Sequence, residues 1–451
     1  MNIDNLHILS RLGFGPKLEW LDDPQKSGLL TDKDYLVNWL FSEIPTFQDS
    51  ETTFQNQRIN HFGDISDTWR SRSPHDAQRM DWIMEMAIID NPLREKAALF
   101  WSHHVPVRVS FWDFAQTLLL DIYRKNGLGE YKDLLVEISS TPCAMKFLNA
   151  YHSHKSKPNQ NFPRELLEIF TLGVGNYNQF DIEEISRAFT GRRTVFPDIW
   201  DLPYPYKMYI EEDAFDPSDK NIFGQVGNWN GEDAIRIISE QPQCANHLAI
   251  SILNFYLSDI PKKEHIDITA DFLYQNKLNL FKTLKFIVQQ SWFCDKIYVG
   301  NKVKTPIELW VKFLRQTKTK PITTETNYFM LREMGQDVLW PVNVGGWPKG
   351  KAWLKGSKLS NRVFLPSVML EISEQSKEPI TFVKKVYSKF VNSNLYGYQY
   401  EHKVIFNDSV LDNTLTTNNI HISDWLEVTG LPRTRQTGIS QLLQHPKYQF
   451  H

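Results

Sequence analysis

Two glutamates stand three residues apart in the segment KPNQNFPRELLEIF, at the start of an expected helix. Residues at this spacing lie on one face of a helix, so Glu165 and Glu168 should point to the same side. Paired carboxylates can bind a hard cation or act as general acid and base. Glu165 and Glu168 are therefore candidates for catalysis and for metal binding. Asn161 and Arg164, within a turn of them, are candidates for ligand binding.

The same segment also has a purely structural interpretation. Acidic residues in the first turn of a helix stabilise it by complementing the helix dipole. Arg164 could meanwhile bridge to a neighbouring element. The sequence leaves both interpretations open.

Two adjacent histidines end an apolar helix in the segment FWSHHVPVR. Successive residues of a helix differ by about 100° in direction, so His103 and His104 cannot both face one metal ion on a regular backbone. Either ring could bind a metal ion, and His104 is also a candidate catalytic residue for proton transfer. The alternative for each ring is a capping or core role at the end of the helix.

The elements that must position these residues are mainly helices. Apolar residues recur at helical spacing, and glycine, proline and asparagine mark the ends of the repeats. Gly127 and Gly129 fit helix ends, whereas Thr141 before Pro142 fits an N-cap with proline in the first turn. Helices are expected over 75–90, 93–105, in three pieces over 114–150, 163–173, 181–189, in several pieces over 230–293, and over 305–316.

Two regions interrupt the helical pattern. Residues 192–229 contain several prolines and aromatic residues, which indicates a long irregular insertion with a short β-hairpin in PYKMYIEEDAF. Residues 340–357 are again rich in glycine, proline and tryptophan. We therefore expect a mainly α fold, a large multi-helical single body with irregular loops. One helical domain should cover 1–391, with amphipathic stretches at 362–373 and 381–390, and an irregular C-terminal region over 392–451 should pack on it.

The composition excludes several classes of protein. The chain has 451 residues, with 50 Lys and Arg against 53 Asp and Glu, which gives a net charge of −3. Such a balance provides no overall field for nucleic acid, so no nucleic-acid partner is expected. Three widely spaced cysteines offer no disulfide framework or zinc motif, so any metal would be held by carboxylates and histidine. There is no recognisable signal peptide and no apolar stretch of membrane-spanning length, which predicts a cytoplasmic protein.

Several segments together resemble the bacterial family called domain of unknown function 1800. They include LHILSRLGFGP, FWSHHVPVR, NGLGEYKDLL, PNQNFPRELLEIFTLGVGNYNQFDIEEISRAFTG, GQVGNWNGEDAI, KTPIELW and PVNVGGWPKGKAWL. The resemblance runs over roughly residues 6–375 and is weak beyond them. Members are often encoded beside a family that resembles sulfatases and phosphatases, and many carry export signals. The resemblance thus implies a partner of that kind and an association with the envelope, without naming a reaction.

This chain departs from the family pattern at two places. The family usually has Phe-Trp-His-x-His, whereas Ser102 occupies the first histidine position here and His104 the second. It also usually has His-Asp where this chain has Phe215 and Asp216. If those histidines form one site in other members, either His103 substitutes for one of them or the chemistry is lost. If they are structural, nothing is lost.

The leading hypothesis is a cleft formed by the helix that ends at His104, the helix that contains Glu165, and the loop NVGGWP. This cleft would bind a polar ligand or a divalent cation, with hydrolytic chemistry as an extension. The competing hypothesis is a non-catalytic interaction or assembly protein, whose motif residues lock helices together and whose Trp-rich loops contact a sulfatase-like partner.

Four further residues complete the ligand-binding candidates: Asp216, Lys220, Asn343 and Trp347. Asp216 is also a candidate metal ligand, in the segment FDPSDKNIFG. An EF-hand is excluded for this segment, because the helix-loop-helix frame and the terminal glutamate are not where a calcium loop requires them.

Overall fold

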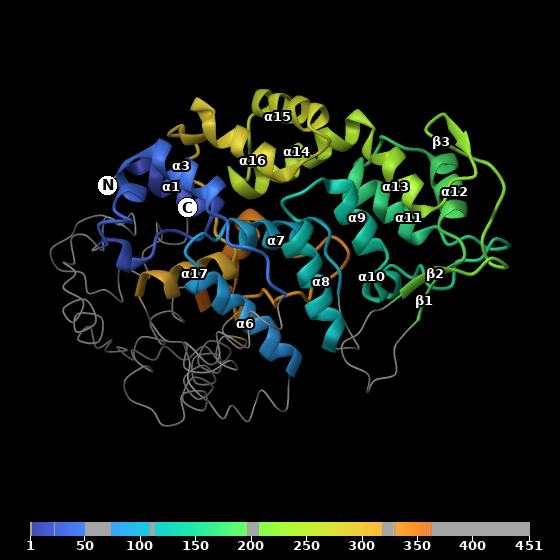
Figure 1. The fold of residues 1–451 in the computed structure, drawn as a ribbon, viewed down its shortest axis with the longest axis horizontal. Coiled ribbons are helices and arrows are strands. Elements are labelled where there is room, and N and C mark those ends of the chain that lie inside the picture. The colour runs from blue at the N-terminus through green and yellow to red at the C-terminus, as the bar shows by residue number, and fades with distance from the viewer. Residues whose placement is uncertain are drawn as a thin grey trace.

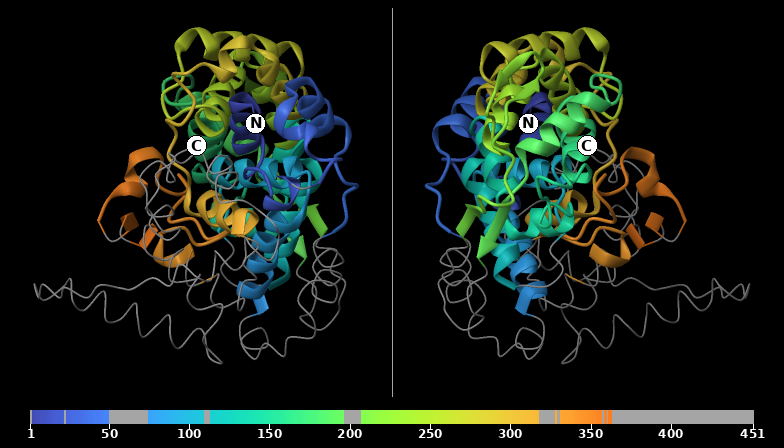
Figure 2. Two further views of the ribbon diagram at one scale, coloured as in Figure 1. Left: turned by 90° about the vertical axis from the view of Figure 1, so that its left-hand side faces the viewer. Right: turned by 90° about the vertical axis from the view of Figure 1, so that its right-hand side faces the viewer.

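The structure is a computed structural model, which describes residues 2–21, 23–49, 74–108, 113–195, 207–317, 328, 331–356, 358–359 and 361–362. Within these residues the fold is mainly α, as the sequence predicts, with two small two-stranded sheets. Figure 1 shows α7 in the middle of the molecule, with α14, α15 and α16 on one side and α6 and α17 on the other. The segment 331–356 lies on one side of the helical body (Figure 2).

The first part of the chain supplies the helices around α7. They are α1 (Ile3–Leu12), η1 (Leu18–Leu21), α2 (Gly28–Thr31), α3 (Lys33–Ser42), α6 (Pro74–Ile88), α7 (Leu93–His104), α8 (Asp113–Asn126), α9 (Tyr131–Ser139) and α10 (Pro142–Phe147). The three expected helices over 114–150 are confirmed. Thr141 caps α10 by accepting a hydrogen bond from the Ala144 N–H, and Pro142 occupies its first turn, as predicted.

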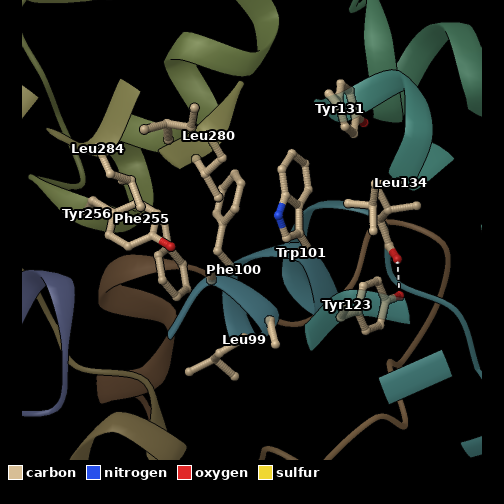
Figure 3. Packing of buried hydrophobic residues seen from close by; sticks show 14 of the residues in the cluster. Leu99, Phe100, Trp101, Tyr123, Tyr131, Leu134, Phe255, Tyr256, Leu280 and Leu284 are labelled. Atoms are coloured by element: carbon tan, nitrogen blue, oxygen red, sulfur yellow. Dashed lines mark hydrogen bonds between the residues drawn. The ribbon is translucent and has the colours of Figure 1, made fainter. Parts of the chain in front are cut away.

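Helix α7 is buried on almost every side, which explains its central position. Phe100 packs against Phe255 and Tyr256 of α14, with ring centroids 5.4 and 5.5 Å away. Trp101 stacks on Tyr131 of α9 at 4.8 Å. Figure 3 shows Phe100 and Trp101 inserted between these two groups of aromatic residues. Burial of each large apolar side chain contributes about 1.5–3 kcal/mol, so this packing fixes the end of α7, where the two histidines lie.

The middle of the chain contains two small two-stranded sheets within 192–229, the range that was expected to be an irregular insertion. The elements are α11 (Asn161–Glu165), η3 (Leu166–Thr171), α12 (Gln179–Ala188), β1 (Arg192–Val195), β2 (Lys207–Ile210), β3 (Lys220–Ile222) and β4 (Gln225–Gly227). The hairpin expected within PYKMYIEEDAF differs in one respect: β2 pairs with β1, antiparallel, from the beginning of the insertion. A second antiparallel pair, β3 with β4, was not predicted.

The last described helices follow the predicted pattern closely. They are α13 (Gly231–Ser239), α14 (Pro242–Tyr256), α15 (Lys263–Gln275), α16 (Leu280–Gln289), η4 (Ser291–Cys294), α17 (Pro306–Thr317) and η5 (Gly350–Leu354). Asn230 and Asp233 form a capping box at the start of α13. The stretches expected at 362–373 and 381–390 and the region 392–451 lie outside the described residues, apart from Arg362. No described helix combines the length and the apolar character needed to cross a membrane.

Candidate functional site

The helix that carries the two candidate glutamates is not regular. The sequence predicts one helix from Pro163 to Gly173, but α11 gives way to the wider π-helical turn η3. The Leu172 and Gly173 N–H groups both donate to the Leu167 carbonyl, at 2.8 and 3.0 Å. Gly173 has a φ of +79°, which favours glycine and ends the turn. Such turns are frequent at functional sites, and they leave nearby carbonyls without partners in their own helix.

Three side chains from other helices cap the carbonyls at the end of η3. The Phe170 carbonyl accepts hydrogen bonds from His104 Nε2 at 3.1 Å and from the Tyr131 hydroxyl at 2.7 Å. The neighbouring Ile169 carbonyl accepts one from His247 Nε2 at 2.8 Å. Helices α7, α9 and α14 therefore hold the turn that positions the candidate glutamates.

These contacts define the chemical state of two histidines. A carbonyl can only accept, so the Nε2 atoms of His104 and His247 must carry protons. Burial, followed by His247 and Lys349, lowers the pKa of His104 well below its usual value. Burial also lowers the pKa of His247. Both rings are therefore neutral at pH 7, with centroids 5.8 Å apart, and no hydrogen bond within the described part of the chain engages either Nδ1 atom.

His103 points to a different side of α7 from His104, as the helical geometry predicts. The Gln336 side-chain oxygen accepts from the Ile307 N–H at 3.0 Å, which orients the amide so that its nitrogen donates to His103 Nε2 at 2.8 Å. His103 therefore has the opposite tautomer, with its proton on Nδ1. Burial lowers the pKa of His103 to about 3, against the opposing effect of Glu308. This ring is neutral and engaged in the core.

The Trp347 loop packs against the same end of α7. The Trp347 and His103 ring centroids are 5.0 Å apart. Gly346 has a φ of +83°, and a Cβ there would lie 3.4 Å from the His103 carbonyl oxygen. Asn343 is exposed and accepts from the Gly345 N–H at 2.9 Å, which shapes the loop. The three segments of the expected cleft thus meet at the end of α7.

The two glutamates are half-buried and have different surroundings. Glu168 accepts a hydrogen bond from the Tyr177 hydroxyl at 2.8 Å. Within the described part of the chain, the Glu165 carboxylate has no hydrogen bond or ion pair. Burial and then the charge of Glu168 raise the pKa of Glu165, although Arg164 opposes this. We call Glu165 and Glu168 together the acidic turn. A hydrogen bond holds the Glu168 carboxylate in place, whereas the Glu165 carboxylate is open, without a partner among the described residues.

The other two candidates on α11 make only modest contacts. Arg164 is exposed, and its guanidinium lies 3.4 Å from the Gln179 side-chain oxygen. The Asn161 side chain donates to the Leu148 carbonyl at 2.9 Å and so ties α11 to the end of α10. Arg164 remains available to a ligand, whereas the Asn161 amide nitrogen has a structural contact.

Asp216 belongs to a different network. Its carboxylate accepts from Arg187 Nε of α12 at 2.8 Å and from the Ser218 N–H at 3.0 Å. Arg187 also pairs with Glu184 at 2.6 Å. Burial alone would raise the pKa of Asp216, but the hydrogen bonds from Arg187 and Ser218 lower it to about 2. Asp216 therefore ties the segment 192–229 to α12. We call the network of Arg187, Asp216 and Lys220 the clamp.

Lys220 is part of the same network. Its ammonium donates to the Asp216 carbonyl at 2.5 Å and to the Asn228 side-chain oxygen at 3.1 Å. It also lies 4.6 Å from the centre of the Phe215 ring. Within the described ranges, no three His, Cys, Asp or Glu residues are grouped so that they could hold a metal ion. The structure thus brings His104 to the turn that carries Glu165 and Glu168, but places Asp216 and Lys220 in the clamp.

The chain matches the profile of the family described as "Protein of unknown function (DUF1800)" over residues 7–450. It belongs to this family. The match extends well beyond the range 6–375 inferred from the motifs and takes in nearly the whole chain. No curated protein and no solved structure matches the chain.

The two departures from the DUF1800 pattern lie in different surroundings. Ser102 is buried in α7, and its hydroxyl donates to the Leu99 carbonyl at 2.8 Å. Phe215 lies beside Lys220 in the clamp. His103 is hydrogen-bonded to Gln336, so its ring is not turned toward the carbonyls that His104 caps.

Sequence reasoning did not identify several residues that shape the site. His247, Tyr131 and Tyr177 contact η3 or the acidic turn, and Gln336 fixes the tautomer of His103. His247 is the only titratable residue of the mostly apolar segment ANHLAISILNF, which was an available signal. Tyr131 and Gln336 have no distinguishing local pattern, because their partners are far away in the sequence, and Tyr177 has none either, although Glu168 is near it in the sequence.

Proposed function

We propose that this protein binds a polar ligand at the acidic turn, and that Glu165 and Glu168 are the residues that contact it. The observation that carries the proposal is the half-buried Glu165 carboxylate, which has no partner among the described residues while Glu168 lies close enough to raise its pKa. A carboxylate in this state gains from a cation, an ammonium group or a hydroxyl that approaches it. The exposed Arg164 next to it would bind an anionic part of the same ligand.

The finer proposal is hydrolytic chemistry at this pair. One of two neighbouring carboxylates can act as acid and the other as base when their surroundings give them different pKa values. The Tyr177 hydroxyl donates to Glu168 and holds its carboxylate in place, whereas burial favours the protonated form of Glu165. Glu165 would then act as general acid and Glu168 as general base or as a ligand of a divalent cation. Such a cation would take its remaining ligands from water and substrate.

His104 supports this proposal as a positioning residue. Its ring caps the carbonyl of Phe170, two residues after Glu168, and its neutral state suits a buried place beside His247. A rigid turn keeps two carboxylates at a constant separation, which general acid and base catalysis requires. His104 would therefore affect the site by holding η3.

The alternative is an interaction or assembly role beside a sulfatase-like partner. Two exposed apolar side chains favour it: Val174 and Phe180, 77% and 51% exposed, follow the acidic turn. In that role Arg164 would lock helices together. Its exposure and its single 3.4 Å contact with Gln179 instead favour a residue that is available to a ligand.

The test is a double variant, Glu165→Gln with Glu168→Gln, compared with Asp133→Asn and Glu137→Gln on α9. Both pairs remove two carboxylates from one helix face without changing side-chain size. We expect wild type and the α9 variant to bind Mn²⁺ or Mg²⁺, seen by elemental analysis and by a rise in melting temperature, and the acidic-turn variant to lose at least about tenfold in affinity. A screen of phosphate and sulfate esters then tests hydrolysis. Identical cation binding and identical turnover in all three proteins would falsify the proposal.

A further inference from the structure

A second group of charges lies inside the molecule, on the α17 side of α7. Its members are basic residues from α1, α7, α17 and the segments beside them, all between 0% and 6% exposed: Arg11, Lys96, Lys304, Lys312 and Arg362. We call this group the cationic core. Basic side chains are rarely buried so completely unless an acid pairs with them, so the contacts of each charged group here are informative.

The members of the cationic core are close to one another. Lys96 Nζ lies 4.9 Å from the centre of the Phe14 ring. Phe14 adjoins Gly15, where a Cβ would lie 3.6 Å from the Lys312 side chain. The Arg362 guanidinium donates to the Lys304 carbonyl at 2.7 Å. Burial lowers the pKa of Arg11, Lys96, Lys304 and Arg362, and the charge of Glu308 opposes this in each case, so these four groups lie around one acid of α17.

Glu308 is the acid at the centre of this cluster, and its oxygens are already engaged. Lys96 Nζ lies 2.5 Å from Glu308 Oε1, and the Thr305 N–H donates to Oε2 at 2.8 Å. Asp259, at the margin, pairs with Lys302 at 3.2 Å. Neither acid makes a hydrogen bond to Arg11.

Arg11 is a fully buried member of this group whose side chain makes a single hydrogen bond among the described residues. It is 1% exposed, and Nη2 donates to the Tyr298 carbonyl at 2.8 Å. Its Nε and Nη1 atoms are buried and have no hydrogen-bond partner in the part of the chain that the structure describes. A guanidinium stays charged in proteins, so donors that are removed from water without an acceptor are strongly unfavourable.

Mutual repulsion adds to this cost. Burial lowers the pKa of Arg11 to about 9, with Glu308 and Asp259 opposing the change. Burial lowers the pKa of Lys304 well below its usual value, and the charges of Lys312 and Arg362 lower it further. An anion beside Arg11 would satisfy its two open donors and reduce the repulsion among the neighbouring positive charges.

We infer that the cationic core binds a multivalent oxyanion, a phosphate or sulfate group, with Arg11 as its main donor. Guanidinium groups match the oxygens of phosphate and sulfate in geometry and charge. The burial of Arg11 implies that the anion is enclosed by the fold, so that it would remain bound through purification. This site is separate from the acidic turn, and the inference does not depend on the proposed function.

The direct test uses the unmodified full chain, purified in chloride buffers without phosphate or sulfate. The protein is unfolded in acid, and the released anions are identified by ion chromatography, which distinguishes phosphate from sulfate. In parallel, melting temperatures are measured in sodium phosphate, sulfate and chloride at equal ionic strength. We expect either close to one oxyanion released per chain or a melting temperature at least about 2 °C higher in one of the oxyanions than in chloride.

Matched variants separate specific binding from the general stabilising effect of these salts. Arg11→Met removes the guanidinium, whereas Arg192→Met removes an equally buried arginine of β1, which donates to Ser139 and Ser140 and has one open donor, Nε, among the described residues. Loss of the oxyanion effect in Arg11→Met alone supports the inference. If Arg11→Met does not fold, Arg11→Lys replaces it, with an expected loss of at least about tenfold in anion affinity. No released oxyanion together with equal melting shifts in wild type and both variants would show that the chain balances its own charge.

Discussion

The acidic turn and the cationic core are both groups of like charges, and α7 takes part in the contacts of both. His104 of α7 caps η3 beside Glu168, and Lys96 of α7 pairs with Glu308. They differ in access to water: the glutamates of the acidic turn are half-buried, whereas Lys96 and Glu308 are 0% and 1% exposed. Water can stabilise an open carboxylate at the turn, but every charge in the core must find its counter-charge in the protein or in a ligand.

The same residue type therefore has two different roles. Glu308 is engaged on both oxygens and is part of the framework, whereas Glu165 has no partner among the described residues and is partly exposed to water. When one member of a buried ion pair is removed, the other is left as an unpaired buried charge, which strongly destabilises the fold. At the turn, removing Glu165 leaves nothing unpaired. Equivalent substitutions at the two places should have opposite consequences for stability.

The largest effect is expected from Glu308→Gln. The amide cannot neutralise Lys96, so a charged ammonium would remain buried between Phe14 and Phe255. Breaking a buried pair in this way typically destabilises by about 3–5 kcal/mol. The measurement is the free energy of unfolding from urea denaturation at pH 7.

The control for this prediction removes both charges. Lys96→Met with Glu308→Gln removes the Lys96 ammonium together with its counter-charge and should recover at least half of the lost stability. A double variant as unstable as Glu308→Gln alone would mean that the pair matters through its contacts with Thr305 and the rest of α17, not through its charge balance.

An intermediate effect concerns His103, which lies between the two regions. Its pKa is about 3 in the folded chain and about 6.5 when unfolded, so the unfolded chain binds more protons between these values. His103 therefore contributes stability that is fully present above pH 6.5 and is lost as the pH falls toward 3. The linkage slope is at most about 1.4 kcal/mol per pH unit.

The variant His103→Gln isolates this contribution, since glutamine can still accept the hydrogen bond from Gln336. Its unfolding free energy should be lower than that of wild type at pH 7, and the gap should narrow as the pH falls from 6.5 to 4. Denaturation curves at four pH values measure this difference in unfolding free energy between the two proteins. All other titrating groups contribute equally to both proteins, so they do not affect the difference. A gap that does not change with pH would mean that folding leaves the pKa of His103 unchanged.

Local rules predicted the helices but not their long-range contacts. The caps at Thr141 and Asn230 and the divergence of His103 and His104 follow from helix geometry alone. The π-helical turn was not predictable, because capping by residues of three other helices stabilises it. The β1–β2 pairing and the Lys96–Glu308 pair join segments far apart in the sequence, and no local pattern specifies such partners. For the site, spacing placed the two glutamates together but could not show that Tyr177 anchors only one.

The smallest effect is expected from Glu165→Gln, and it should be neutral or stabilising. Because the pKa of Glu165 is raised in the folded chain, the folded state holds its proton more tightly, and its ionisation opposes folding as the pH rises above about 4.5. Glutamine removes this effect and the repulsion from Glu168. Solvent screening of this half-exposed group limits the gain to about 0.5 kcal/mol or less. Urea denaturation at pH 5 and pH 8 measures it, and the gain should be larger at pH 8. A loss of more than about 1 kcal/mol would place Glu165 in the framework with Glu308, and would remove the distinction between an open acidic turn and a closed cationic core.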